Sequence, residues 1–224
     1  MSLIKEIFTS SIGRKVAMAL SALFLMIFLL QHLAINLTSV FSPELFNELS
    51  HFMGTNPVVQ FALQPVLMAG VIFHFAMGFV LEAQNRKARA VSYAKNNSAA
   101  NASWFSRNMI WSGLFILFFL LFHLKDFWVH EMVVKYINPE EPNATRYHGE
   151  VLAMFKDPLR VAVYVVAFVF LTLHLLHGFS SAFQSMGMNN KYSATLKSVG
   201  VVYSIAVPAG FVAIALIHYV NSLG

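Results

Sequence analysis

Five long apolar stretches, separated by short polar segments, dominate the pattern of residues along the chain. They run approximately over Val16–Thr38, Val58–Ala83, Met109–Val129, Val161–Phe183 and Val199–Val220. Each is long enough to cross about 30 Å of hydrocarbon, which takes about 20 helical residues. Backbone groups in lipid must be hydrogen-bonded within the protein, so spans of this kind form helices. The pattern predicts an all-α integral membrane bundle of five transmembrane helices, built by a single domain over residues 1–224.

The composition agrees with a membrane setting. Hydrophobic residues make up 58% of the chain and charged residues 11%, whereas soluble domains carry about 25% charged residues. The chain has no cysteine, which excludes disulfides, cysteine-bound zinc and iron–sulfur clusters held by this chain. The basic residues behind the net charge of +5 lie in short loops beside the apolar spans, so we expect no nucleic-acid partner. We expect Val16–Thr38 to stay as a transmembrane helix, because no small-residue cleavage site ends it.

The distribution of lysine and arginine predicts the orientation. Ten of these residues flank the N-terminus and the loops after the second and fourth spans: Lys5, Arg14, Lys15, Arg86, Lys87, Arg89, Lys95, Arg107, Lys191 and Lys197. Five lie on the opposite side, over a longer loop: Lys125, Lys135, Arg146, Lys156 and Arg160. Because positive residues collect on the cytoplasmic side, we expect the N-terminus in the cytoplasm and the C-terminus outside. Residues 94–103 are a polar linker on the inner side, and the outer loop His130–Pro158 has room for a short amphipathic helix.

Histidines occur in every predicted span, although ionisable residues there are costly and usually functional. They are His32, His74, His123, His174, His177 and His218. His32 lies 17 residues after Lys15, and His123 lies 16 residues after Arg107, on two helices that both run outward. At about 1.5 Å per residue, each histidine is roughly 25 Å from the cytoplasmic edge. These two residues therefore share a level in the outer leaflet.

The two returning helices carry a second pair at a lower level. His74 lies 12 residues before Arg86, and His174 lies 10 residues before Gln184. Both spacings correspond to roughly 15–18 Å from the cytoplasmic edge. Two pairs at two levels suit two bis-histidine irons, one above the other. We predict that two haem b groups are held, one by His74 and His174 and one by His32 and His123.

A glycine follows each histidine of the inner pair at the same spacing. Gly78 ends the segment HFAMG after His74, and Gly178 ends HLLHG after His174. Residues four apart lie on one face of a helix. A glycine there leaves a recess in which a porphyrin can press against the backbone. The alternative is that these glycines allow close helix–helix packing, as glycine often does in membranes.

Each histidine taken singly is as well explained by a hydrogen-bonded core residue or a proton-relay site. The matched pairs favour haem over this alternative and over zinc, which needs its ligands gathered at one tetrahedral point. An iron with two axial imidazoles has no open position for oxygen or substrate, so electron transfer is the natural role. The loops show no active site for a soluble substrate, and chemistry of that kind needs another subunit.

The sequence also predicts where the remaining histidines lie and what two prolines do to their helices. His177 lies on a face next to that of His174 and cannot bind the same iron. His218, near the outer end of the fifth span, is expected at the interface, and His130 and His148 are expected to be solvated in the second outer loop. Pro65 and Pro208 are expected to kink the second and fifth spans.

At these residues the chain resembles a known family, the single-subunit, five-helix, dihaem cytochrome b anchor of succinate dehydrogenases and quinol:fumarate reductases. The matching segments are IFLLQHLAIN around His32, LSHFM around His51, VIFHFAMG around His74, LFHLKDFW around His123 and TLHLLHGFSSAFQSMG around His174. The order and spacing of these segments match over nearly the whole chain. The resemblance implies that His74 and His174 hold the proximal haem, near a cytoplasmic iron–sulfur subunit. It implies that His32 and His123 hold the distal haem.

The resemblance also implies partners and a place in the cell. It implies a flavoprotein subunit and an iron–sulfur subunit on the cytoplasmic side, membrane quinone (menaquinone) as substrate, surrounding lipid, and a higher oligomer of the complex. The expected location is the inner (cytoplasmic) membrane of a bacterium, crossed several times.

Quinone reduction couples electrons to protons, so a quinone site needs a group that exchanges protons. His51, in the first outer loop near the outer pair, is the candidate because histidine titrates near neutral pH. A loop histidine without a role explains His51 equally well. Some dihaem fumarate reductases have a glutamate two residues before the ligand of the fourth helix, proposed as a proton route. Here Thr172 stands at that position, which puts this route in doubt.

Two other functions fit the same pattern. One is the cytochrome b subunit of another respiratory complex, such as a hydrogenase or a formate dehydrogenase. The other is a haem-free proton-relay or transport protein in which the histidines carry protons.

Overall fold

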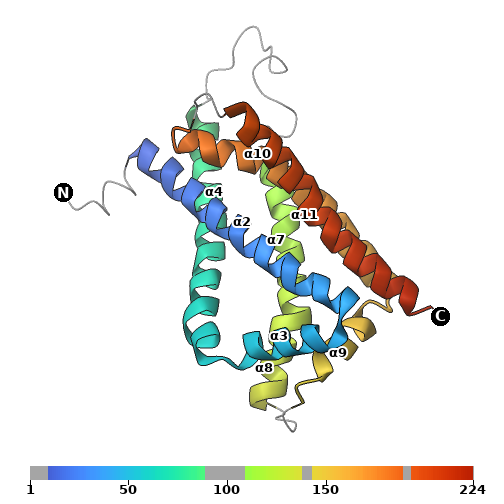
Figure 1. The fold of residues 1–224 in the computed structure, drawn as a ribbon. Helices are drawn as coiled ribbons and strands as arrows, with labels where there is room; N and C mark the ends of the chain where they lie inside the picture. Colours follow the sequence, from blue (N-terminus) through green and yellow to red (C-terminus); the bar gives the residue numbers. More distant parts are fainter. Residues whose placement is uncertain (1–9, 89–108, 138–142, 189–192, 224) are drawn as a thin grey trace.

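The computed structural model describes residues 10–88, 109–137, 143–188 and 193–223, and every regular element within them is a helix (Figure 1). Five helical stretches in this part of the chain are long and apolar enough to cross a membrane: Ser11–Phe41, Val59–Lys87, Met109–Ile137, Pro158–Ser185 and Ala194–Asn221. Many of their large apolar side chains are exposed on the outside of the bundle, where lipid would cover them. The all-α class and the multi-pass membrane character are confirmed.

The spans are built mainly from five long helices: α2 (Ser11–Phe41), α4 (Gln64–Ala88), α7 (Met109–His123), α10 (Pro158–Ser185) and α11 (Ser193–Asn221). Helix α2 begins where the Ser10 hydroxyl accepts a hydrogen bond from the Gly13 N–H at 2.9 Å. Helix α10 begins with Pro158, which follows an Asp157 carboxylate that caps the Leu159 N–H. Ordinary capping thus fixes the start of these two spans.

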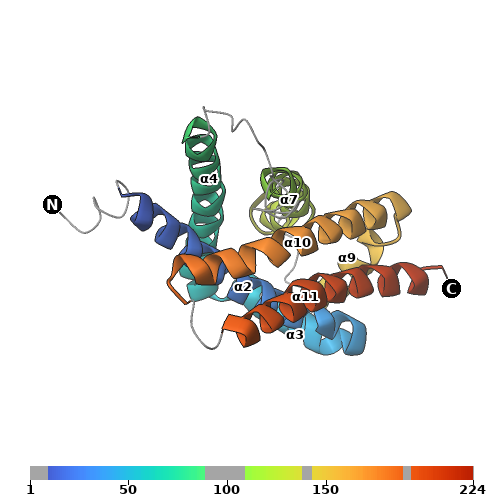
Figure 2. The same ribbon diagram turned by 90° about the horizontal axis from the view of Figure 1, so that it is seen from above.

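Four of the long helices form a ring, in the order α2, α4, α7 and α10 (Figure 2). Each helix packs against the next, and α10 closes the ring on α2, while α11 packs outside against α10 and α2. Among the described residues, the two diagonal pairs, α2 with α7 and α4 with α10, do not pack closely. Contacts between diagonal helices therefore come from side chains that reach into the middle of the ring. Helix bundles commonly hold cofactors in this position.

The first described residues of α2 and the last of α11 lie at opposite ends of the bundle (Figure 1). We call these ends the N-side and the C-side. Their placement relative to the cytoplasm stays a prediction. Parts of the sequence on which it depends lie outside the described residues: the linker 94–103 and the cations Lys5, Arg89, Lys95, Arg107 and Lys191.

Two short helices cover the C-side. Helix α3 (Pro43–Thr55), which the sequence analysis did not predict, begins at Ser42, whose hydroxyl accepts from the Leu45 N–H at 3.2 Å. Helix α9 (Arg146–Met154) is the short helix expected in the second outer loop. The two helices pack against each other.

The third span continues beyond its predicted end at Val129. It runs on through η2 (Leu124–Val129), α8 (His130–Met132) and η3 (Val133–Ile137), with η2 and η3 wound as π-helix. The extension stays helical because α3 and α9 supply partners for its polar side chains. A further π-helical turn, η1 (Val59–Leu63), precedes α4, and there the Gln64 N–H bonds to the Val59 carbonyl. The next residue, Pro65, has no N–H to donate to a helical hydrogen bond. The second proline, Pro208, lies inside helix α11, which continues on both sides of it.

Some glycines of the bundle are required by packing, and Gly200 is the clearest case. A Cβ added there would lie 2.5 Å from Cδ1 and 3.0 Å from Cγ of Phe179, a buried residue of α10. We expect Gly200→Ala to lower the free energy of unfolding by about 1–3 kcal/mol, because the ring must leave its position. Thermal denaturation in detergent measures this loss. Gly149→Ala is the control, since a Cβ there meets nothing within 4 Å, and an equal loss in both variants would contradict the packing role.

Candidate functional site

The inner pair lies on two diagonal helices of the ring. His74 is on α4 and His174 on α10, and their ring centroids are 6.3 Å apart with the ring planes at 70°. The two helices do not pack closely, so these two side chains span the space between them. The structure thus brings together the two histidines that the sequence analysis paired.

The outer pair bridges the other diagonal. His32 on α2 and His123 on α7 have ring centroids 5.8 Å apart, with ring planes at 89°. Aromatic rings surround them: Phe28 and Phe211 beside His32, and Phe119, Phe127 and Tyr164 beside His123. This pair also matches the predicted pairing.

Contacts with serines show that the two pairs lie at different levels. The His74 ring contacts Ser21 of α2, and His32 comes eleven residues later on the same helix. The His174 ring contacts Ser112 of α7, and His123 again comes eleven residues later. Eleven residues of helix rise about 16 Å. The inner pair therefore lies about that far toward the N-side from the outer pair.

Each inner histidine shares its Nδ1 with a buried serine. His74 Nδ1 lies 3.1 Å from the Ser21 hydroxyl, and His174 Nδ1 lies 3.2 Å from the Ser112 hydroxyl. Each serine donates its only hydroxyl proton along its own helix, to the carbonyl of Met18 (2.8 Å) or Met109 (2.9 Å). With its proton on the carbonyl, the serine oxygen can accept from the histidine, which places the ring proton on Nδ1. The Nε2 lone pair of each ring is left to bind a metal.

The spacing within both pairs fits a shared metal ion. Two imidazoles on opposite sides of one ion have ring centroids about 6 Å apart, because each metal–nitrogen bond is about 2 Å and each nitrogen lies about 1 Å from its ring centre. The observed spacings of 6.3 Å and 5.8 Å are close to this value. No group of three or more metal-binding side chains occurs in the part of the chain that the structure describes. The residues present therefore suit two-ligand axial binding better than a tetrahedral metal site.

The glycines after the inner histidines differ from the packing glycines. A Cβ on Gly78 would have only the Met18 methyl group within 4 Å, at 3.7 Å, and one on Gly178 only the Met109 methyl, at 3.6 Å. These are ordinary contacts with the tips of flexible side chains. No backbone of a neighbouring helix approaches, so close helix packing does not explain these two glycines. They leave room beside each histidine.

His148 and His218 form a third pair; His148 is half-buried rather than fully solvated, and the interfacial position expected for His218 stays a prediction. His218 is only 2% exposed, and its Nε2 lies 2.8 Å from the Ser39 hydroxyl. His148 on α9 is half-buried and donates from Nε2 to the Ser39 carbonyl at 3.0 Å. Helix α9 packs against α11 and thereby brings the two histidine rings together. The centroids of these two rings are 5.8 Å apart. Because both Nε2 atoms are engaged with Ser39, this pair does not offer the free Nε2 atoms of the inner pair.

The other histidines lie apart from the two central pairs. His51 is half-buried on α3, 6.2 Å from the Tyr147 ring between centroids, and its Nδ1 is buried without a hydrogen-bond partner. His177 lies on α10, half-buried, and not in either of the two pairs. His130 belongs to the helical extension rather than to a loop. Its side chain is 43% exposed, in partial agreement with the solvated position expected, and lies 3.5 Å from Glu150.

A cleft of about 520 Å³ opens beside the third pair on the C-side. Its polar lining residues are Ser39, His148, Lys156 and His218, together with Asn221 and Ser222 at the end of α11. A series of neighbouring rings connects it with the outer pair. His123 lies 6.1 Å from Tyr164, which lies 5.3 Å from Phe155, which lies 6.3 Å from His218, measured between ring centroids.

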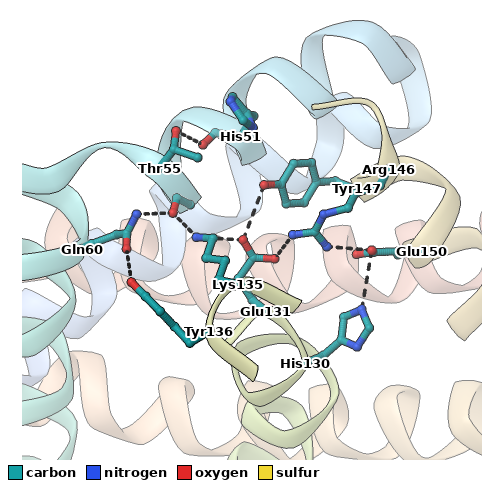
Figure 3. A network of polar contacts seen from close by, with 11 residues as sticks. His51, Thr55, Gln60, His130, Glu131, Lys135, Tyr136, Arg146, Tyr147 and Glu150 are labelled. Atoms are coloured by element: carbon teal, nitrogen blue, oxygen red, sulfur yellow. Dashed lines mark hydrogen bonds and ion pairs between the residues drawn. The ribbon is translucent and has the colours of Figure 1, made fainter. Parts of the chain in front are cut away.

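A polar network holds the C-side helices together (Figure 3). Glu131 lies 2.8 Å from Lys135 and forms a second ion pair with Arg146 of α9. Arg146 also bonds Glu150 at 2.6 Å, and Lys135 donates to the Gly54 carbonyl at the end of α3. Burial alone would lower the pKa of Arg146, but its hydrogen bonds to Glu150 and Glu131 raise that pKa above its ordinary value. Arg146 therefore stays positively charged within the network at neutral pH.

Comparison of the chain with known protein families, with curated proteins and with solved structures finds no match.

The sequence analysis missed Ser21 and Ser112, although a signal for them exists. The pattern Met-x-x-Ser followed eleven residues later by His occurs twice, as Met18–Ser21–His32 and as Met109–Ser112–His123. Together with the repeated His-x-x-x-Gly, it marks two similar helix pairs, α2 with α4 and α7 with α10. A search for internal repeats in the spans would have found it.

The C-side network predicts a measurable effect on stability. We expect Glu131→Gln to lower the free energy of unfolding by about 1–3 kcal/mol, because two largely buried cations lose their carboxylate. Thermal denaturation in detergent reports the change. Glu82→Gln is the matched control, because its partner Arg86 is 64% exposed and such pairs contribute only about 0–1 kcal/mol. A loss no larger than that of the control would show that the network does not hold the C-side together.

Proposed function

We propose that this chain is the membrane anchor and electron-transfer subunit of a succinate:quinone oxidoreductase, with two haem b groups held between its helices. The observation that carries the proposal is the pair of histidine bridges across both diagonals of the ring, at two levels about 16 Å apart. A haem with two axial histidines supplies one-electron transfer, since neither axial position is open to substrate. Two such sites at different depths suit passage of electrons across a membrane.

The chain's own residues have distinct tasks in this proposal. His74 and His174 would hold the proximal haem toward the N-side, and His32 and His123 the distal haem toward the C-side. The room beside Gly78 and Gly178 would receive the porphyrin edge. The N-side is taken as cytoplasmic, in a bacterial inner membrane, where an iron–sulfur subunit and a flavoprotein subunit would dock. The chemistry on succinate or fumarate belongs to those subunits.

The quinone, menaquinone by family resemblance, is proposed to exchange electrons at the C-side. The cleft beside His148 and His218 is large enough for a quinone ring, and neighbouring aromatic rings connect it with His123. His148 donates from Nε2 to the Ser39 carbonyl, so its Nδ1 is the ring nitrogen left to face a ligand. His51 is not among the residues that line this cleft. His148 therefore takes the place of His51 as the first candidate for proton exchange.

A reduced-minus-oxidised spectrum of the protein, purified from its native membrane with its bound subunits, tests the proposed function. We expect a b-type band, co-purifying flavoprotein and iron–sulfur subunits, and succinate:quinone activity. Haem without those subunits or that activity would indicate another respiratory complex. Absence of the b-type band would leave the proton-relay alternative.

Substitution of the four histidines tests the pairing. We expect His74→Ala and His174→Ala to lose one and the same haem, and His32→Ala and His123→Ala to lose the other, because each iron needs both axial ligands. Haem-specific spectra and redox titration distinguish the two groups. His177→Ala is the control and should keep both. Loss of different haems within one pair would refute the arrangement.

A comparison of two histidine variants tests the quinone cleft. Glutamine at position 148 can keep the hydrogen bond to the Ser39 carbonyl but cannot exchange protons as imidazole does. We expect His148→Gln to lower quinone turnover roughly tenfold or more, with both haem spectra unchanged, and His51→Gln to have a much smaller effect. The assay is steady-state reduction of a soluble quinone analogue. The reverse order of effects would move the quinone site to α3.

A further inference from the structure

We propose that Ser21 and Ser112 are positioning residues that fix the orientation and the proton-bearing nitrogen of the inner histidines, and so set the electron affinity of the inner haem. This inference rests on the proposed function. It concerns residues that touch the ligands and do not bind the iron themselves.

The two serines are equivalent in their burial and in their hydrogen bonds. Ser21 is 9% and Ser112 8% exposed, so both hydroxyls are buried inside the ring. Each belongs to the helix that precedes, in the chain, the helix of the histidine it contacts: α2 before α4, and α7 before α10. The same contact is therefore built twice, from two different helix pairs. A chance core contact gives no reason for that repetition.

The direction of the hydrogen bonds decides the chemistry. A serine inside a helix can satisfy its hydroxyl by donating back to its own helix, and both serines do so. The oxygen still has lone pairs to offer, and the histidine Nδ1–H uses one of them. This places the ring proton on Nδ1 and leaves the Nε2 lone pair free. A metal-bound histidine ordinarily needs such a partner on its other nitrogen, which orients it and raises its basicity.

The outer pair is built differently. His123 Nδ1 is buried without a hydrogen-bond partner, and aromatic rings lie beside both outer histidines where serine hydroxyls contact the inner ones. Removing the serine hydroxyls should therefore change the inner haem alone. A more basic ligand favours ferric over ferrous iron, so loss of the acceptor should raise the midpoint potential of the inner haem.

The experiment uses the whole complex with its haems in place, in the wild-type form and with Ser21→Ala, Ser112→Ala and Ser204→Ala. Ser204 is the matched control, a fully buried serine of α11 whose hydroxyl has no hydrogen-bond partner. Redox titration followed at the haem bands gives the two midpoint potentials. Low-temperature EPR gives the axial-ligand signature of each haem. The inner haem is the one that His74→Ala removes.

We expect each of the first two variants to shift the inner reduction equilibrium roughly tenfold toward the ferrous form, which is about 59 mV for a one-electron couple. The EPR signal of the inner haem should change with it, while the outer haem and the Ser204→Ala protein should match the wild type. Ser21→Thr and Ser112→Thr, which keep a hydroxyl, should restore the wild-type potential.

Unchanged inner potentials and EPR signals in Ser21→Ala and Ser112→Ala would overturn the inference while leaving the proposed function intact. A shift of equal size in Ser204→Ala would overturn it as well. If an alanine variant loses the inner haem, recovery of haem in the threonine variant supports the role of the hydroxyl, and no recovery overturns it. A wild-type protein without b-type haem would refute the proposed function itself.

Discussion

The structure depends on how its ring of four helices is closed across the middle. Helices α2 and α7, and helices α4 and α10, face each other without packing closely, and imidazole rings at two levels bridge the space between them. Polar rings inside an apolar bundle are costly unless each ring nitrogen finds a partner. For the inner pair, two serines satisfy one nitrogen of each ring and leave the other free. The interior of the ring is thus arranged around these imidazole rings.

The surroundings of the two levels suit different tasks. Around the inner pair, small residues and the ends of methionines leave room, and the serines hold each ligand. Around the outer pair, aromatic rings fill the space and continue toward the cleft at His218. The C-side is covered by α3 and α9 and held by the Glu131 network (Figure 3). In the proposed function, the inner level faces the partner subunits and the outer level faces quinone.

The sequence predicted much of this arrangement because hydrophobicity and helical rise are local properties. Five apolar stretches gave five spans, and counting residues from the charged ends placed His32 with His123 and His74 with His174. What could not be predicted required knowledge of how separate segments pack. The burial of His148 and His218 arises from α9 folding over the ends of α2 and α11. The helical extension to Ile137 depends on partners from α3 and α9, and Ser21 reaches His74 only because α2 and α4 are neighbours.

The haem content of the purified protein tests the central claim most directly. The account predicts two haem b groups per chain, both with the low-spin EPR signal of two axial imidazoles. A single haem, a high-spin iron with an open axial position, or no haem at all would contradict it.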